Sequence, residues 1–129
     1  MIVLDTHIWI WWVHNDGKLS QTAAAAIQAH ESAVIGISAM SCWEIAKLVE
    51  YHRLALPCDI SEWFEQALSY PAVQLLDLTP EIAIASTQLL AFHRDPADQV
   101  ITATAKVYNC PLVTADTKIL SYSGVLTIA

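Results

Sequence analysis

Charged side chains are scarce in this chain of 129 residues: Asp, Glu, Lys and Arg make up 15% of it, whereas hydrophobic residues make up 55%. This apolar excess predicts either a large core or a surface that binds a partner. The longest stretches without a charged residue, such as residues 32–43, reach about a dozen residues, against the roughly 18 that a membrane span needs. We therefore expect a soluble protein with no membrane association.

Features of a secreted protein are also missing. No basic segment precedes the apolar start of the chain, and Asp5 interrupts it, so nothing there resembles a signal peptide. The three cysteines are an odd number, widely spaced, and form no CxxC pair, which argues against a disulfide framework and against a zinc site. These absences predict a cytoplasmic protein with reduced thiols.

Basic residues are few as well. Six Lys and Arg stand against thirteen Asp and Glu, which gives a net charge of -7. An electrostatic field of this sign repels polyanions. A nucleic-acid substrate would therefore need favourable contacts at its binding site that offset this repulsion.

Short apolar segments alternate along the chain with longer segments of helical character. Capping signals such as Thr79-Pro80 and Asp95-Pro96 stand at predicted helix starts. We expect strands over residues 2–4, 33–37, 73–78, 112–114 and 125–128, and helices over residues 6–13, 20–30, 38–52, 60–70, 79–92 and 95–108. For the third of these helices the cap is either Ser38 or Ser41, so it starts at one or the other. This alternation predicts a single α/β domain over residues 1–129, a three-layer sandwich with a mainly parallel central sheet flanked by helices.

Four acidic residues, Asp5, Glu44, Asp98 and Asp116, lie where these strands end or these helices begin. Because the crevice of an open parallel sheet lies beyond the carboxyl ends of its strands, we expect all four at one edge. Two unit charges about 4 Å apart repel by roughly 4 kcal/mol at an effective dielectric constant near 20, so four ionised acids require protonation or a cation. Oxygen ligands without a Cys or His cluster favour Mg²⁺ or Mn²⁺, which can activate water for phosphodiester cleavage.

Each acid taken singly also has a structural explanation. Glu44 could complete a capping box with Ser41, and Asp98 could interact with the dipole of its own helix. Asp116 could form an Asx turn. Asp5 is harder to explain in this way, since an acid directly after a buried apolar strand is costly without a partner. The joint placement of all four favours a site.

Four motifs, in this order and spacing, resemble those of a PIN domain. They are Leu4-Asp5-Thr6-His7, Ser41-Cys42-Trp43-Glu44-Ile45-Ala46, His93-Arg94-Asp95-Pro96-Ala97-Asp98 and Leu112-Val113-Thr114-Ala115-Asp116. More narrowly, the chain is similar over essentially its whole length to the VapC-type toxins of bacterial toxin-antitoxin pairs. The resemblance implies a Mg²⁺- or Mn²⁺-dependent endoribonuclease toxin, neutralised by a cognate antitoxin and prone to form a homodimer.

The resemblance also implies roles for individual residues. Asp5 and Asp98 would be the main metal ligands, with Glu44 and Asp116 binding through water or completing a second site. All four would then be catalytic. The outer-shell partners implied by the match are Thr6, Asp95 and Thr114.

One departure from the family pattern is Gln99, which occupies a place where Arg commonly follows the aspartate. This change removes a cation near the scissile phosphate, so phosphate contacts would come from other basic residues. The candidates are Lys47, Arg53, Arg94 and Lys106. The alternative explanation for each of them is a solvated surface charge.

Aromatic residues are concentrated near the start of the chain, where Trp9, Trp11 and Trp12 alternate with Ile and Val. A helix that is apolar all round is buried or faces a partner. We expect two of these tryptophans in the core and at least one at an interface with an antitoxin helix or a second protomer. The five histidines lack a metal-ligand spacing, and His7 alone is expected close to the site.

Two other enzyme or signalling classes fit this sequence less well than a nuclease. A phosphatase with an aspartyl nucleophile would want a second Asp two residues after Asp5, where this chain has His7. A receiver-type phosphoacceptor domain would want acidic partners for Asp5 near the chain start. The alternative that stays open is a catalytically weak PIN-like scaffold that binds protein or RNA. No element reads bases recognisably, so transfer, ribosomal and messenger RNA are all open as substrates.

Overall fold

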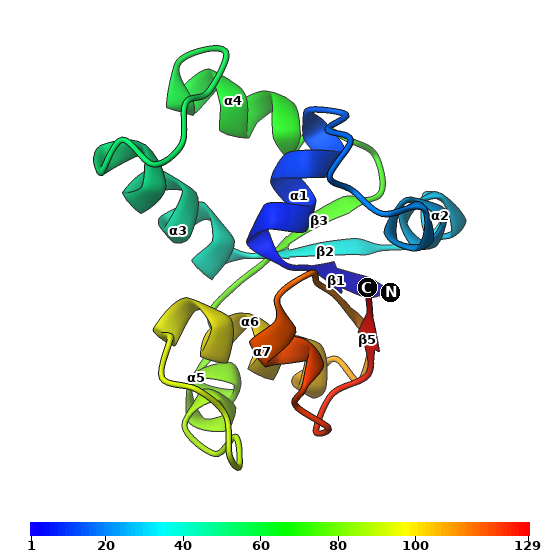
Figure 1. The fold of residues 1–129 in the computed structure, drawn as a ribbon, viewed down its shortest axis with the longest axis vertical. Helices are drawn as coiled ribbons and strands as arrows, with labels where there is room; N and C mark the ends of the chain where they lie inside the picture. The colour runs from blue at the N-terminus through cyan, green and yellow to red at the C-terminus, as the bar shows by residue number, and fades with distance from the viewer.

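Five short strands form one central sheet in the computed structural model, which describes residues 1–129 (Figure 1). The strands are β1 (Ile2–Leu4), β2 (Ile35–Ser38), β3 (Val73–Leu76), β4 (Leu112–Val113) and β5 (Thr127–Ile128). They lie in the order β3-β2-β1-β4-β5, and every neighbouring pair is parallel. The central strands are buried on both faces, which explains why their segments are nearly continuous apolar runs. The predicted parallel sheet is confirmed.

Seven helices flank the sheet. They are α1 (Thr6–Val13), α2 (Gln21–Ala29), α3 (Ala39–Glu50), α4 (Ile60–Ala67), α5 (Pro80–Ser86), α6 (Pro96–Val107) and α7 (Thr117–Leu120). Each follows a side chain that accepts a hydrogen bond from a backbone N–H of its first turn; these caps are Asp5, Ser20, Ser38, Asp59, Thr79, Asp95 and Asp116. Because a cap satisfies a donor that the helix leaves unpaired, it fixes where the helix starts.

The two faces of the sheet carry different cores, because side chains of β1 alternate between them. Ile2 and Leu4 pack with Trp9 in the larger core, beside α1 to α4. Val3 faces the other way and packs with Ile101 of α6. Figure 1 shows α1, α3 and α4 on one side of the sheet and α5, α6 and α7 on the other. The predicted three-layer α/β sandwich is therefore confirmed.

Strand β1 lies at the centre of the sheet, with β2 and β3 on one side and β4 and β5 on the other. The reversal lies between β1 and β4, where Leu4 pairs in register with Val113. The loops that leave two such strands diverge and open a crevice at their carboxyl ends. Asp5 and Thr114, the next residue after each strand, lie in contact at this crevice, with the Thr114 hydroxyl 2.7 Å from Asp5 Oδ2.

The helix after Thr79 differs most from its prediction, since it ends at Ser86 instead of Phe92. The hydroxyl groups of Ser86 and Thr87 each donate to the carbonyl oxygen three residues earlier, at 2.7 Å. Side-chain bonds of this kind compete with the backbone bonds that would extend a helix. The chain from residue 87 to residue 95 is consequently an irregular loop that leads into α6.

Other predicted boundaries are wrong by two or three residues. The helix predicted over 60–70 ends at Ala67, the strands predicted over 33–37 and 73–78 span 35–38 and 73–76, and the strand predicted over 125–128 begins at Thr127. Strand β3 stops at Leu76 because its partner Ser38 is the last residue of β2. The short helix α7 was not predicted, because four residues are too few for a periodic pattern.

The three tryptophans of α1 lie at different depths. Trp9 is 0% exposed and packs edge-on against Trp63 of α4, so the prediction of a partner surface is wrong for this residue. Trp11 and Trp12 are half-buried, and Trp12 lies against Tyr70, with 4.8 Å between the ring centroids. Because successive residues of an α-helix are rotated by about 100°, these three side chains point in different directions, and only Trp9 enters the core.

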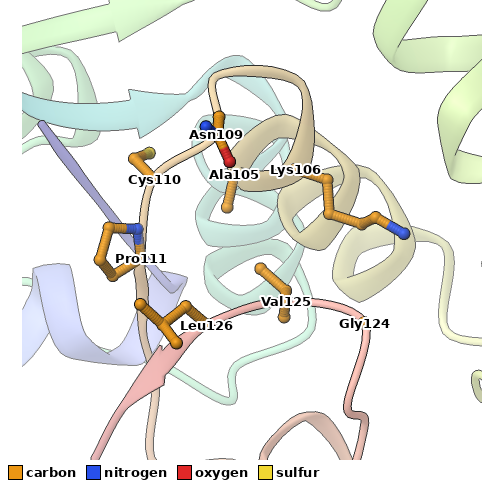
Figure 2. A pocket seen from close by; sticks show the side chains of 8 residues that line it. All are labelled: Ala105, Lys106, Asn109, Cys110, Pro111, Gly124, Val125 and Leu126. Carbon is orange, nitrogen blue, oxygen red and sulfur yellow. The ribbon is translucent and has the colours of Figure 1, made fainter.

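The two ends of the sheet differ in polarity. At the end opposite the carboxyl ends of the strands, a cavity of about 220 Å³ lies between the end of α6 and the segment before β5 (Figure 2). Ala105, Lys106, Cys110, Pro111 and Val125 are among its lining residues, and none of them is acidic. None of the seven helices has the length and apolar character that crossing a bilayer requires.

Candidate metal centre

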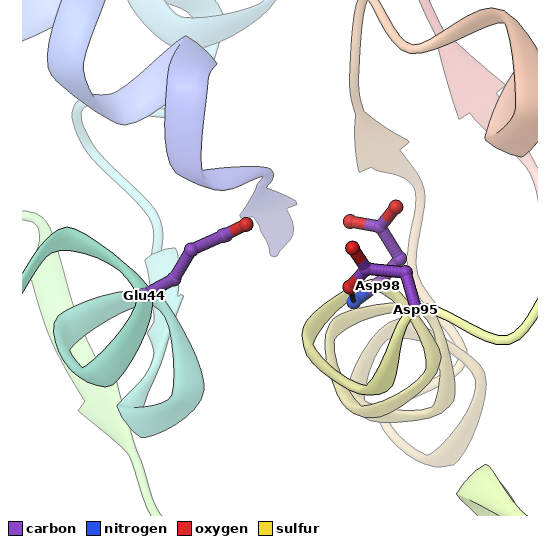
Figure 3. A group of neighbouring side chains, drawn as sticks. All are labelled: Glu44, Asp95 and Asp98. Atoms are coloured by element: carbon purple, nitrogen blue, oxygen red, sulfur yellow. Dashed lines mark hydrogen bonds between the residues drawn. The ribbon is translucent and has the colours of Figure 1, made fainter. Parts of the chain in front are cut away.

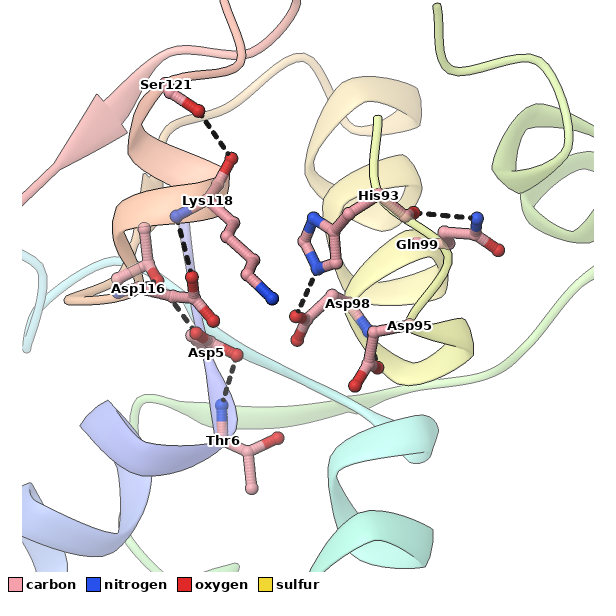
Figure 4. Close-up of polar contacts among 10 residues, drawn as sticks. Asp5, Thr6, His93, Asp95, Asp98, Gln99, Asp116, Lys118 and Ser121 are labelled. Atoms are coloured by element: carbon pink, nitrogen blue, oxygen red, sulfur yellow. Dashed lines mark hydrogen bonds and ion pairs between the residues drawn. The ribbon is translucent and has the colours of Figure 1, made fainter. Parts of the chain in front are cut away.

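Asp5 is held rigidly at the end of β1. Its Oδ1 accepts a hydrogen bond from the Thr6 amide at 2.8 Å, which starts α1, and its Oδ2 accepts from the Thr114 hydroxyl at 2.7 Å. The side chain is buried, because α1 and the loop after β4 cover it. The strand therefore delivers a carboxylate with a fixed orientation to the edge of the sheet, as Figure 4 shows.

Glu44 lies in the second turn of α3 and takes no part in capping that helix. Ser38 supplies the cap, with its hydroxyl accepting from the Met40 amide at 3.1 Å. The Ser41 hydroxyl accepts instead from the Thr6 hydroxyl at 3.0 Å, so the capping-box explanation for Glu44 is wrong. The Oε1 atom of Glu44 is buried and has no hydrogen-bond partner.

The start of α6 adds two further carboxylates. Asp95 caps the helix by accepting from the Asp98 amide at 3.0 Å, and the Asp98 side chain is buried one turn later. Carboxylate oxygens of Glu44, Asp95 and Asp98 lie within 4.8 Å of one another (Figure 3). Asp95, which the family match implied as an outer-shell partner, is therefore close enough to donate directly to the same cation.

Asp116 completes the group from the loop after β4. Its backbone amide donates to the Thr114 hydroxyl at 3.1 Å, and its Oδ1 accepts from the Lys118 amide at 2.8 Å, which starts α7. Asp5, Asp116, His7 and Trp11 line a cavity of about 180 Å³. The Asx-turn explanation is thus correct for one oxygen of Asp116, while the residue still lies beside Asp5.

Burial, together with the neighbouring negative charges, raises the pKa of three of these acids. Burial raises the pKa of Asp5, and hydrogen bonds from Thr114 and Thr6 to the carboxylate oppose the rise. Burial also raises the pKa of Glu44, with Asp5 and Asp95 raising it further. For Asp98, burial and the negative charges of Asp5, Asp95 and Asp116 raise the pKa to about 7, although His93 opposes them.

These residues fit a hard divalent cation. The donors are carboxylate oxygens without a thiol, which is the ligand set of Mg²⁺ and Mn²⁺. The unpartnered Oε1 of Glu44 offers a buried acceptor that a cation would satisfy. Two carboxylates 4.8 Å apart repel by roughly 3 kcal/mol at an effective dielectric constant of 20, whereas a helix N-terminus returns about 0.3–1 kcal/mol per acid. The dipole of α6 alone therefore does not hold the cluster together.

The structure does not bring all of the candidate phosphate contacts to the acids. Lys47 forms an exposed ion pair with Glu50 at 3.0 Å on α3, and Lys106 donates to the Tyr122 hydroxyl at 3.1 Å near the end of α6. Arg53 follows the end of α3, whereas Arg94 directly precedes the Asp95 cap. Arg94 is therefore the only one of the four in the loop that leads into the acidic group.

Two residues near the acids were not anticipated. His93 Nε2 lies 2.7 Å from Asp98 Oδ2, and the Lys118 side chain extends toward the space between Asp116 and Asp98 (Figure 4). Sequence proximity is the one signal that could have found them, since His93 stands five residues before Asp98 and Lys118 two after Asp116. His7, the one histidine expected near the site, lines the cavity beside Asp5.

Known proteins resemble this chain in sequence and in fold. The model of the PIN domain family matches residues 2–125. Ribonuclease VapC22 of Mycobacterium tuberculosis is 32% identical over 122 residues, which cover 94% of this chain and 91% of that protein.

Two solved structures share the architecture. FitAcB from Neisseria gonorrhoeae is 21% identical with a TM-score of 0.70, over 100% of this chain and 97% of that one. A toxin-antitoxin complex from Klebsiella pneumoniae contains a chain that is 22% identical with a TM-score of 0.66, over 98% of this chain and 97% of that one. Identities this low establish a common fold and no more.

Proposed function

The chain belongs to the PIN domain family, and on that premise we propose that it is a divalent-metal-dependent endoribonuclease, the toxin of a toxin-antitoxin pair. The relative of highest identity named above is a ribonuclease, and one structural neighbour is a toxin-antitoxin complex. An RNA substrate places this activity in the cytoplasm. The observation that carries the proposal is the convergence of five carboxylates at one edge of the sheet in a chain of otherwise low charge.

We assign the ligands of the cation from the burial of the carboxylates, from their grouping and from the resemblance to the family's motifs. Asp5 and Asp98 are the main ligands, because both are buried and come from different layers of the fold. Glu44 and Asp95 share the space beside Asp98, and Asp116 binds through water or at a second position. A bound Mg²⁺ or Mn²⁺ supplies Lewis acidity and lowers the pKa of water for attack on a phosphodiester.

The surrounding residues keep the donors oriented. The Thr114 hydroxyl donates to one oxygen of Asp5 and accepts from the Asp116 amide, so it links these two carboxylates. Thr6 holds the other oxygen of Asp5 through its amide and reaches Ser41 through its hydroxyl. Both threonines are buried, and the hydrogen bonds from the Thr114 hydroxyl and the Thr6 amide fix the orientation of the Asp5 carboxylate toward a cation.

RNA needs a positive contact in a chain with a net charge of -7. We assign this contact to Lys118 and Arg94, which are exposed at the acidic edge, and not to Lys47 or Lys106, which have partners elsewhere. Lys118 has no ion-pair partner, and its backbone is fixed by the Asp116 side chain and the Ser121 hydroxyl. A cation on a fixed backbone at the mouth of the site can contact a phosphate oxygen of the bound strand.

The proposed partners are an antitoxin and a second copy of the chain. A groove of about 560 Å³ between α1 and α4 is lined by Val13, Leu56, Trp63 and Tyr70, and would accept an amphipathic segment of a basic antitoxin. Trp43 on α3 and Ile84 on α5 are 48% and 59% exposed, and we propose that exposed apolar side chains such as these take part in a homodimer. Sedimentation of the purified chain, alone and with the product of a neighbouring small gene, tests both assemblies.

Cleavage of RNA with added Mg²⁺ or Mn²⁺ tests the function directly. We expect cleavage by the wild type, its loss on chelation with EDTA, and its loss in Asp5→Asn. The matched control is Asp77→Asn, an exposed aspartate after β3, which should cleave like the wild type. Activity that survives both chelation and Asp5→Asn would defeat the metal mechanism, and a folded, inactive chain that still binds RNA or protein would establish a scaffold instead.

A further inference from the structure

The loop between α5 and α6 places an imidazole ring directly on the acidic site. His93 Nε2 lies 2.7 Å from Asp98 Oδ2, and the two side chains are 21% and 12% exposed. The other ring nitrogen, Nδ1, is buried and has no hydrogen-bond partner. Because leaving a buried polar atom unpaired is unfavourable, the bond to Asp98 is the one hydrogen bond that favours this position of the ring, and other contacts help to hold it.

Contacts from two other parts of the chain fix this ring. The Gln99 side chain donates to the backbone carbonyl of His93 at 3.0 Å (Figure 4). The Phe92 ring stacks on the imidazole with centroids 4.4 Å apart, and Tyr122 packs edge-on against Phe92 at 5.1 Å. The backbone of His93 is thus anchored by the Gln99 amide, and its imidazole is held against Asp98 by the stacked Phe92 ring.

We propose that His93 is a positioning residue of the cation site: its Nε2–H binds one oxygen of Asp98 and so presents the second oxygen to a cation shared with Glu44 and Asp95. The inference rests on the proposed function, because it requires a cation at this cluster. The single hydrogen bond made by the Asp98 carboxylate is the one to His93, so no other side chain sets its orientation. Gln99 has a role of its own as the residue that anchors the His93 backbone.

If His93 does not orient Asp98 but competes with the cation for it, the opposite effect on cation binding is expected. If His93 merely occupied the carboxylate in place of a cation, its removal would free an acceptor and tighten cation binding. If it orients Asp98, its removal lets that side chain rotate, and cation binding weakens. Loss of an outer-shell partner typically costs about 10–100-fold in metal affinity. The sign of the change therefore separates the two cases.

The test is Mn²⁺ affinity, measured by titration calorimetry and by electron paramagnetic resonance, on the full chain without RNA. We expect His93→Ala to weaken Mn²⁺ binding by about 10–100-fold. His93→Gln, whose amide can donate to Asp98, should stay within a few-fold of the wild type. His30→Ala, which removes an imidazole beyond the end of α2, is the matched control and should bind as the wild type does.

Gln99→Ala keeps the test decisive if the alanine variant at position 93 does not fold. It leaves the imidazole in place but removes its anchor, and we expect a few-fold loss of Mn²⁺ affinity. Unchanged or tighter binding in both His93→Ala and Gln99→Ala would overturn the inference while the wild type still binds Mn²⁺ and cleaves RNA. A wild type that neither binds Mn²⁺ nor cleaves RNA would instead overturn the proposed function, and this inference with it.

Discussion

The two ends of α6 differ in the environment of their charged side chains. At its N-terminal end, Asp95 and Asp98 lie in a group of acids in which burial and repulsion raise the pKa of Asp98 to about 7. At its C-terminal end, Lys106 lies where the helix dipole favours a positive charge, and its ammonium group donates to the Tyr122 hydroxyl. One end gathers charges of a single sign, whereas the other pairs its charge with a favourable partner.

The charges at the C-terminal end of α6 are arranged as stability favours, whereas those at its N-terminal end are not. The repulsion between acids at the first turn, roughly 3 kcal/mol per pair at 4.8 Å, exceeds what the dipole returns there. The buried side chains between the two ends, such as Ile101 and Ala105, hold the helix against the sheet and offset that cost. Departures from favourable electrostatics that persist in this way are expected at functional sites.

The largest effect expected is on catalysis at the acidic end. Asp98→Asn keeps the size of the side chain but removes a ligand and a charge, so kcat for RNA cleavage with Mn²⁺ should fall by about 100-fold or more. The same variant without metal should be at least as stable as the wild type at pH 8, because a repelling charge is gone. Single-turnover cleavage and urea unfolding measure the two effects, and a variant that cleaves normally would contradict the ligand assignment.

The middle of the helix should respond in stability instead. Ile101 is 0% exposed, and Ile101→Ala leaves a cavity between α6 and the sheet, so we expect the free energy of unfolding to fall by about 2–5 kcal/mol. Leu90, which is 84% exposed, is the matched control, and Leu90→Ala should change it by less than about 0.5 kcal/mol. Equal losses in the two variants of a urea titration would show that the packing described for α6 is wrong.

The metal-free protein should lose stability as pH rises. The pKa of Asp98 is about 7 in the folded chain against 3.8 ordinarily, so the folded state binds more protons between these values, and the free energy of unfolding falls across that window. Asp5 and Glu44, whose pKa values are also raised, act in the same direction.

Urea unfolding between pH 4 and pH 8 in EDTA measures this slope, for which we expect a total change on the order of 1–3 kcal/mol. Asp98→Asn should flatten the slope, and saturating Mn²⁺ should reverse it, because a cation binds the ionised carboxylates. A metal-free wild type that gains stability over the same range would rule out the crowding of acids at this end.

The smallest effect expected distinguishes the two lysines at opposite ends of the fold. Lys118→Gln removes one cation at the acidic edge, so the slope of log affinity against log salt for single-stranded RNA should decrease by about 0.7. Lys106→Gln, at the far end of α6, should leave that slope unchanged. Filter binding with Ca²⁺ in place of Mn²⁺ measures both without cleavage, and equal slopes in the two variants would remove Lys118 from the site.

Predictions from the sequence succeeded where local chemistry decides the outcome. Thr79 and Asp95 were identified as caps because each precedes a helical pattern, and both accept the expected backbone hydrogen bond. The prediction failed at the end of α5, where the hydroxyl groups of Ser86 and Thr87 compete with the backbone. A helix cap followed by Pro is a recognisable pattern, whereas Ser and Thr occur both within helices and at their ends, so they do not mark where a helix stops.

At the acidic site, too, some features could be predicted from the sequence and others could not. Asp5 could be identified from its position after an apolar strand, and Glu44 and Asp98 from the motifs that surround them. The direction of the His93 ring could not be predicted, because it depends on Phe92 and on a loop whose path is set by tertiary packing. Lys118 was missed for a similar reason, since α7 is too short to leave a pattern.

The sequence by itself therefore determined the alternation of strands and helices and the starts of six of the seven helices, because each follows from neighbours along the chain, and it singled out four acids as candidate ligands. Only the tertiary structure decided that Asp95 joins Glu44 and Asp98, that Trp9 enters the core, and that an imidazole and an ammonium group face the carboxylates. The physical reason is that distances between side chains of separate elements are set by how those elements pack, and residue types alone do not specify them.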